Sequence, residues 1–297
     1  MMKYSIATTM RAAALALLTI PPAGHAMSAA EIMKNVDDVN RKASTTAIVK
    51  VQLSTCRYVA SGAGAATCKE TPRVTVLEVG EKKWGPEKKD SRAIALVLQP
   101  VTDKGVGMLT YEYTDTDREN DVLMYLPALE KVRRVVSGGD GNEDGGSFFG
   151  SEFFVDDTQL KKLNDYSYTL VSEDVLDGHA VWIIDAVPTE KRAAKTQYSK
   201  SRMWIDKERM LILREDIYNR AGLFYRQRLN RDLALVDNVW LARQQTMNNL
   251  STNRMTVLRN ISAAYNKDVP DELVTERSLT DATFRERTLA TLRSNYK

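Results

Sequence analysis

Short segments in which apolar and polar side chains alternate are the feature that most restricts the fold of this chain. Between Ala47 and Ser54, apolar residues occupy every second position, which is the spacing of a strand with one buried face. Similar segments recur as far as Ala264 and are separated by short turns such as Asp177-Gly178. Because strands do not alternate with helices, the pattern predicts antiparallel pairing rather than a parallel sheet.

We expect about a dozen strands. A sheet with this many twisted strands must curl, split or close upon itself. No repeat of fixed period and no Pro/Ser-rich linker divides the chain, so we expect one domain. The predicted strands are residues 47–54, 73–79, 92–98, 106–113, 121–126, 131–136, 166–172, 180–187, 202–206, 211–219, 223–232, 239–248 and 254–264.

Helices are predicted at the two ends of this β-rich region. Ser28 and Glu31 have the spacing of a capping box, and apolar residues that follow share one face, so the sequence predicts a helix over 29–42. We also expect a short helical turn over 156–163 and a helix over 281–294. A curved sheet leaves one natural position for these helices, which is the concave apolar face.

The first 26 residues have the features of a secretory signal peptide. Lys3 and Arg11 are basic, an apolar run covers 12–20, and Gly24-His25-Ala26 offers small residues at the positions that a signal peptidase reads. The run is too short for a membrane span. We therefore expect residues 1–26 to be cleaved and residues 27–297 to form the mature domain in the periplasm.

Charge and histidine content argue against two classes of function. Without Lys3 and Arg11, the chain carries 40 basic and 39 acidic side chains, a balance that argues against nucleic acid as a partner. Only His179 remains after the signal peptide is removed, and it lies in a turn sequence. A Ser-His-Asp triad or a histidine-based zinc site is therefore not predicted. We expect no enzymatic activity, no cofactor and no metal.

Cys56 and Cys68 are the two cysteines of the chain. An exported protein meets an oxidising compartment, so the pair is interpreted first as a disulfide that closes the Gly/Ala-rich segment between them. The alternative is a metal-binding or redox pair. Metal sites use clustered His or Cys and redox pairs use short spacing, so the disulfide is favoured.

Residues 120–155 form the most unusual stretch of the chain. Two apolar strands, which include Met124 and Leu126, flank a Leu-Pro-Ala-Leu corner, and a Gly-rich flap over 138–150 follows. The flap leads into four phenylalanines that need apolar cover. They would either line a lipid cavity or fix the flap to the sheet as ordinary core. These phenylalanines are Phe148, Phe149, Phe153 and Phe154.

A basic triplet lies on the second strand of the same hairpin. Lys131 and Arg133 share one face of the strand, and Arg134 points to the other. The triplet could contact a lipid headgroup or an acidic partner. The alternative is a solvated edge that discourages sheet-to-sheet aggregation, which we slightly favour. Trp204 lies in a later strand, where it could line a cavity or pack in the core.

Six segments are distinctive in this order along the chain: Asp121–Val135, Phe148–Phe153, Asp165–Leu170, Met203–Glu208, Leu223–Arg228 and Leu273–Leu279. Together they resemble the periplasmic LolA-like outer-membrane lipoprotein-sorting proteins, in the branch associated with RND/MMPL-type exporters. The resemblance extends over roughly residues 45–280.

The resemblance implies a mainly β (α+β) fold, a curved and incomplete antiparallel β-barrel of about 11–13 strands with helices as a lid. It also implies a hydrophobic cavity that receives acyl chains of lipoproteins or other lipids, for transport to or from the outer membrane. The partners would be an RND/MMPL-type inner-membrane transporter or an outer-membrane acceptor. The flap and the Cys56–Cys68 loop depart from the family pattern.

Two other functions remain open from the sequence. The first is an accessory subunit that docks an RND-type exporter and holds no cargo. It predicts a packed interior, whereas the carrier predicts a cavity. The second is an enzyme acting on carbohydrate or lipid, which predicts clustered carboxylates with perturbed pKa values in a cleft.

Overall fold

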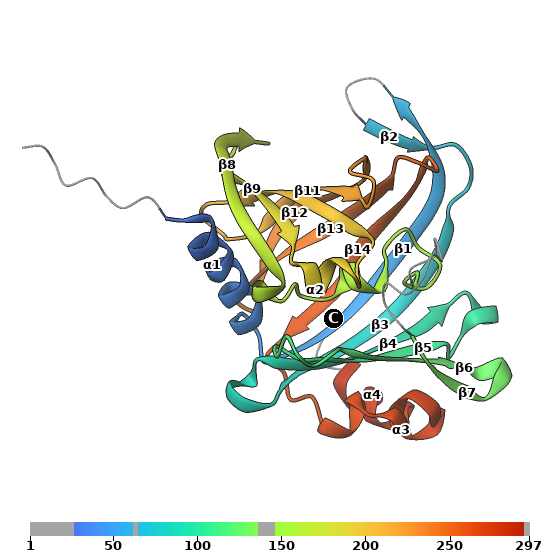
Figure 1. The fold of residues 1–297 in the computed structure, drawn as a ribbon. Helices are drawn as coiled ribbons and strands as arrows, with labels where there is room; N and C mark the ends of the chain where they lie inside the picture. Colours follow the sequence, from blue (N-terminus) through green and yellow to red (C-terminus); the bar gives the residue numbers. More distant parts are fainter. Residues whose placement is uncertain (1–26, 62–64, 136–145, 294–297) are drawn as a thin grey trace, which may run out of the picture.

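The computed structural model describes residues 27–61, 65–135 and 146–293. The predicted signal peptide and most of the Gly-rich flap lie outside these ranges. The fourteen described strands belong to one sheet in the order β7-β6-β5-β4-β3-β1-β14-β13-β12-β11-β10-β9-β8, with β2 paired to β1. Neighbouring strands run antiparallel. β7 and β8 are the edges, so the curved sheet stays open (Figure 1), and the predicted incomplete antiparallel barrel is confirmed.

The strands divide into an N-terminal and a C-terminal half that meet where β1 pairs with β14. The N-terminal half contains β1 (Thr46–Ser61), β2 (Ala65–Cys68), β3 (Arg73–Trp84), β4 (Asp90–Gln99), β5 (Gly107–Glu112), β6 (Asp121–Leu126) and β7 (Lys131–Arg134). The C-terminal half contains β8 (Tyr166–Leu176), β9 (His179–Pro188), β10 (Tyr198–Asp206), β11 (Ile212–Asn219), β12 (Phe224–Val236), β13 (Val239–Asn249) and β14 (Arg254–Tyr265).

Helical segments connect and cover these strands. The α-helices are α1 (Ala29–Lys42), α2 (Glu190–Ala193), α3 (Glu276–Thr280) and α4 (Ala282–Arg293). The 3-10 turns are η2 (Pro86–Lys88), η3 (Val101–Asp103), η4 (Pro127–Leu129), η5 (Val155–Thr158), η6 (Leu163–Asp165) and η7 (Asp271–Val274). No helix in the described ranges is both long and apolar enough to cross a membrane.

The helix α1 covers one end of the concave face. Ser28 and Glu31 form the predicted capping box, with the backbone N–H of each residue bonded to the side chain of the other. Ile32, Met33 and Val36 are buried in one cluster with apolar residues of β9 and β10. Burial of this apolar stripe, rather than helix propensity alone, stabilises a helix of 14 residues.

A second stretch, which we name the cover segment (Gly146 to Asp165), lies over the other part of the concave face. It contains η5 and η6, and its aromatic residues pack against inward-facing residues of β1, β3, β4 and β6. The single helical turn predicted over 156–163 is therefore wrong in detail, because two separate 3-10 turns replace it.

The helices α3 and α4 pack on the opposite, convex face of the N-terminal half (Figure 1). Ile94 and Leu96 point to this face and contact Leu279 and Leu289 in one buried cluster. A Cβ added at Gly107 would lie 2.7 Å from Leu279 Cδ1, so the glycine allows the helix to approach the strand closely. Since both faces of β4 are apolar, the expectation that all helices cover the concave face holds for α1 but not for α3 and α4.

Candidate ligand-binding site

Three adjoining hollows lie between the concave face and its cover. The basic hollow, of about 480 Å³, is bordered by residues 116–120, 156–166 and 191–198. The α1 hollow, of about 330 Å³, lies between α1, residues 157–163 and strands β11 to β13. The end hollow, of about 600 Å³, lies beside residues 38–44 and the start of β13. Leu160 lines all three, so this residue marks their junction.

A buried ion-pair network forms the floor beneath the cover segment. Arg226 on β12 is fully buried and contacts Asp157 at 2.7 Å. The hydroxyl of Tyr198 donates to the other oxygen of Asp157 at 2.8 Å, and Arg226 donates to the carbonyl oxygen of Glu152. Burial alone would raise the pKa of Asp157, but the charges of Arg226 and Arg228 outweigh it and hold the pKa below its usual value. The network therefore fixes the cover segment to the sheet.

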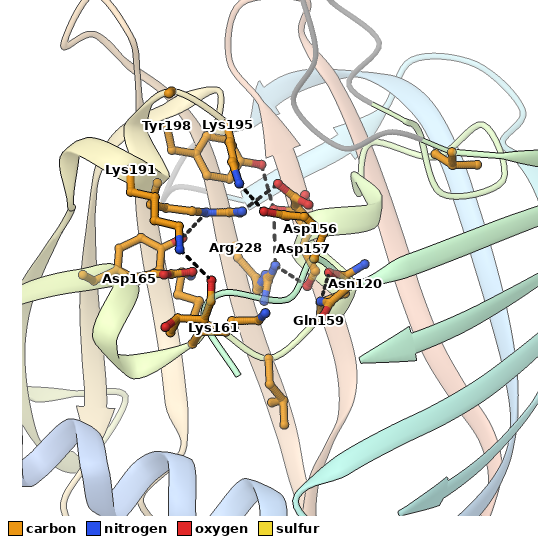
Figure 2. A pocket seen from close by; sticks show the side chains of 18 of the residues that line it. Asn120, Asp156, Asp157, Gln159, Lys161, Asp165, Lys191, Lys195, Tyr198 and Arg228 are labelled. Atoms are coloured by element: carbon orange, nitrogen blue, oxygen red, sulfur yellow. Dashed lines mark hydrogen bonds and ion pairs between the residues drawn. The ribbon is translucent and has the colours of Figure 1, made fainter. Parts of the chain in front are cut away.

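The network continues toward the basic hollow through a second buried carboxylate. Glu215 on β11 is paired with Lys161 and lies 4.0 Å from Arg228. The Arg228 side chain also donates to the carbonyl oxygen of Asp157 at 2.8 Å. Figure 2 shows Arg228 and Asp157 in the middle of this group, with Lys161 beside them. Paired charges therefore line the passage between the basic hollow and the α1 hollow.

Several buried polar atoms at this passage have no hydrogen-bond partner within the described part of the chain. They include Gln159 Nε2, Arg228 Nε, Tyr168 OH and Asn230 Oδ1, and all four residues line the α1 hollow. Buried polar groups are normally satisfied, so ordered water or a polar ligand group is expected to bind these atoms.

The end hollow contains a carboxyl group with a strongly perturbed pKa. Burial, and secondly the charge of Glu81, raise the pKa of Glu112 to about 7, against the opposing effect of Lys83. Lys83 is itself buried and paired with Glu81 at 2.6 Å. Glu112 also accepts a hydrogen bond from the backbone N–H of Leu160, so it contacts the segment that separates the hollows.

The phenylalanines predicted to line a cavity lie together but outside the three hollows. Phe148, Phe149 and Phe153 are at most 9% exposed and belong to one buried cluster. Phe154 stacks on Tyr198 with ring centroids 6.5 Å apart, and the Arg226 guanidinium lies 3.9 Å from its centroid. In the described conformation they fix the cover segment to the sheet.

The other predicted cavity residues are separated by the sheet. Met124 packs against the phenylalanine cluster, and Leu126 is half-buried at the end of β6. Trp204 alternates with the buried Met203 and lies beneath the guanidinium of Arg214 at 4.2 Å, on the convex face.

The basic triplet of β7 is only partly connected to the hollows. Lys131 and Arg133 are exposed, whereas Arg134 lines the basic hollow and is paired with Asp121. Sequence reasoning missed the cations of the basic hollow at Lys161 and Lys162 and those on α2, Lys191 and Arg192. These two pairs of adjacent basic residues were the available signal, but nothing in the local sequence shows that they line the same hollow.

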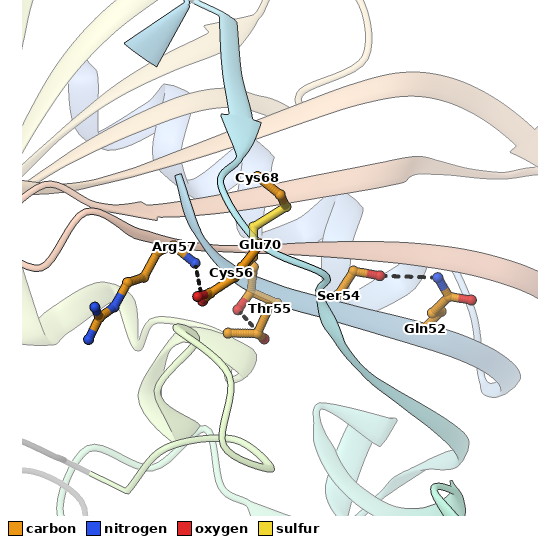
Figure 3. Close-up of a disulfide and its surroundings, with 8 residues drawn as sticks. Gln52, Ser54, Thr55, Cys56, Arg57, Cys68 and Glu70 are labelled. Atoms are coloured by element: carbon orange, nitrogen blue, oxygen red, sulfur yellow. Dashed lines mark hydrogen bonds between the residues drawn. A yellow bond between two sulfur atoms is a disulfide. The ribbon is translucent and has the colours of Figure 1, made fainter. Parts of the chain in front are cut away.

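Cys56 and Cys68 form the predicted disulfide, which links β1 to β2 with Cα atoms 5.7 Å apart (Figure 3). The prediction is confirmed. The segment between the cysteines is not simply a loop, because residues 58–61 pair with residues 65–68. The bridge stabilises a hairpin that extends beyond the curved sheet.

A family model described as an uncharacterized protein matches residues 89–281 of the chain, which is more than half of its length. No curated protein matches it. A DUF1329 family protein from Desulfovibrio piger has a TM-score of 0.73 and 23% identity, and the match covers 84% of this chain and 97% of that protein.

Two further solved structures share the fold. For a putative outer membrane lipoprotein-sorting protein domain from Vibrio parahaemolyticus, the TM-score is 0.71 at 19% identity, over 85% of this chain and 98% of that domain. For a LolA superfamily protein from Nitrosomonas europaea, the TM-score is 0.60 at 14% identity, and the match covers 84% of this chain and 98% of that protein. The resemblance noted in the sequence motifs is thereby confirmed at the level of the fold, which the chain shares with lipoprotein-sorting and LolA superfamily proteins. The chain belongs to the family described by the matching uncharacterized-protein model.

Proposed function

We propose that this protein is a periplasmic carrier that binds an acyl chain of a lipid or lipoprotein on its concave face. The observation that supports the proposal best is the continuity of the basic hollow and the α1 hollow. The two share Gln159, Leu160 and Arg228, and beyond them the wall of the α1 hollow combines apolar residues such as Val36 and Ile212 with polar ones such as Asn230. A charged mouth that leads to a wall with apolar residues suits an amphiphile.

A long acyl chain would need more room than the α1 hollow provides. We propose that α1 or the cover segment moves away from the sheet, and that Phe148, Phe149, Phe153 and Met124 then contact the chain. Burial of each methylene group contributes about 0.8 kcal/mol, so even a short chain offsets a part of this opening. Phe154 stacks on Tyr198 of the basic hollow, Leu126 ends β6 and Trp204 lies on the convex face, so we assign these three a smaller part in the proposal.

The place and the partners of transport form the finer part of the proposal. The disulfide suits an oxidising compartment such as the periplasm. An RND/MMPL-type transporter or an outer-membrane acceptor would open the cover and receive the cargo, with Lys131 and Arg133 as exposed contacts. Cargo binding itself needs no catalytic group in this proposal.

The proposal is tested by blocking the junction of the hollows. Leu160→Trp should reduce uptake of a fluorescent fatty acid by about tenfold or more, because the indole fills the passage. Leu129→Trp is the matched control, since Leu129 is 51% exposed on η4. Equal uptake by both variants and the wild type would contradict binding at this junction. No uptake by any of the three would favour an accessory subunit without cargo.

A further inference from the structure

The lining of the basic hollow is biased toward positive charge, whereas basic and acidic side chains are nearly balanced in the chain as a whole. Its lining includes seven cationic side chains and four anionic ones. Charges of both signs in the lining already have partners, because Asp156 is paired with Arg192 at 3.0 Å, Asp157 with the buried Arg226 at 2.7 Å, Lys161 with Glu215 and Arg134 with Asp121. Three further lysines come from two separate segments: Lys162 follows Lys161 in its loop, and Lys191 and Lys195 lie in and just after α2 (Figure 2).

The outermost cations form ion pairs at the surface, and Lys191 also donates to the backbone carbonyl oxygen of Thr116 at 3.1 Å. Lys191 and Lys195 are four residues apart around α2 and pair with Asp117 and Glu119. Asp117 is 86% exposed and Glu119 is 57% exposed. Exposed pairs of this kind contribute about 0–1 kcal/mol, so an incoming anion can replace the carboxylates at little cost.

Lys162, which follows Lys161 in the same loop, donates to the backbone carbonyl oxygens of Asp115 and Arg118, at 2.6 and 2.5 Å. Both bonds go to neutral oxygens; burial lowers the pKa of Lys162, and the charges of Asp165 and Glu119 oppose that effect. A ligand anion would meet the charge of Lys162 directly.

Two buried donors give an independent indication of the ligand. Gln159 Nε2 and Arg228 Nε are buried without a partner among the described residues, and both residues line the basic hollow. The side-chain oxygen of Gln159 accepts from Asn120 at 2.7 Å, which leaves the amide N–H groups for another acceptor. A ligand rich in acceptor oxygens would satisfy these donors deep in the hollow while the lysines contact it at the rim.

We infer that the basic hollow is a subsite for an anionic headgroup, a phosphate or a carboxylate, of the carried amphiphile. This inference rests on the proposed carrier function. The acyl chain would extend from the headgroup past Leu160 into the α1 hollow. The headgroup contacts therefore lie on α2 and the loop around Lys161, rather than on the exposed cations of β7.

The test compares two lipids that share one acyl chain. Oleoyl lysophosphatidylglycerol carries a net negative charge, and oleoyl lysophosphatidylcholine carries none. The wild-type protein should bind the anionic lipid about tenfold more tightly, since charge-assisted hydrogen bonds replace exposed pairs. Lys191→Glu combined with Lys195→Glu should abolish this preference and leave binding of the neutral lipid unchanged.

The matched control is Lys131→Glu combined with Arg133→Glu, which changes the same charge on the exposed strand β7. It should keep the preference for the anionic lipid. Equal affinity of the wild type for both lipids, or a preference that survives reversal on α2, would overturn the subsite but not the carrier.

Failure to bind either lipid would overturn the proposed carrier function. Binding of inorganic phosphate then tests whether the basic hollow binds an anion without a lipid. Phosphate binding that is lost on reversal of Lys191 and Lys195 but kept in the β7 control would identify a site for free phosphate. No phosphate binding would overturn the anion subsite as well.

Discussion

A buried arginine is costly in a protein unless its charge is paired. The charge of Arg226 is paired with Asp157, and its guanidinium also donates to Tyr198 and to the Glu152 carbonyl oxygen, whereas its Nε has no partner among the described residues. Because the pKa of Asp157 is lowered in the folded state, the pair contributes stability at neutral pH. That contribution is lost as the pH falls through the folded-state pKa.

Removing one partner of this pair should be costly. We expect Arg226→Met to lower the free energy of unfolding by about 3–5 kcal/mol, because it leaves Asp157 buried without its main counter-charge. Asp157→Asn should have an effect of similar size. The double variant should lose less than the sum of the two, by at least about 1 kcal/mol, in urea denaturation. Arg231→Met, at a 59% exposed position of the same strand, is the control and should change little. Strict additivity would contradict direct coupling.

Because the pKa of Glu112 is raised, we expect its contribution to folding stability to depend on pH with the opposite sign to that of Asp157. Its folded-state pKa of about 7 lies above the ordinary value of 4.5, so folding favours its protonated form. Stability should be greatest below the ordinary value and fall by on the order of 2 kcal/mol as the pH rises toward 8. Glu112→Gln should remove this decline in thermal unfolding experiments. If the variant declines as steeply as the wild type, another group causes it. Glu130→Gln, at an exposed position, should behave as the wild type.

At the scale of elements, sequence pattern predicted what local interactions determine. The capping box and the apolar stripe placed α1 at its observed bounds, within which Met33 is buried and Val39 is 38% exposed. Hydrophobic alternation located the predicted strands. The helix α2 was missed because its four residues carry no apolar stripe. The helix α3 was missed because it has only five residues, and the N-cap at Thr275 is too weak a signal by itself.

The hairpin formed by β1 and β2 depends on its disulfide. Replacement of both Cys56 and Cys68 by Ser should lower the free energy of unfolding by roughly 2–3 kcal/mol, because the reduced chain gains loop entropy in the unfolded state. Chemical denaturation checks this value, and the wild type under reducing conditions should match the double variant. If reduction changes the wild type much less than the substitutions do, the loss would come from packing around the buried Cys56.

At the scale of the whole molecule, the curved open sheet could be predicted but the site could not. The number of strands required curvature, and the family resemblance supplied the incomplete barrel. The hollows depend on contacts between distant segments. Lys161 and Lys195 reach one hollow only because η6 and α2 flank the long hairpin of β8 and β9.

The position of the helices shows the same limit. The sequence shows that β4 is apolar on both faces, but not which face receives which helix. The pairing of Leu279 with Gly107 on the convex face is decided by the path of the chain after β14. The concave face is thereby left to α1 and the cover segment, which are the parts that would move under the proposed carrier function.

Native mass spectrometry of the mature protein purified from its own envelope, followed by organic extraction, tests the central claim most directly. The account predicts a stoichiometric lipid adduct on the wild type that is lost in Leu160→Trp and kept in Leu129→Trp. An unmodified protein mass, with no uptake of fluorescent fatty acid, would contradict the carrier function.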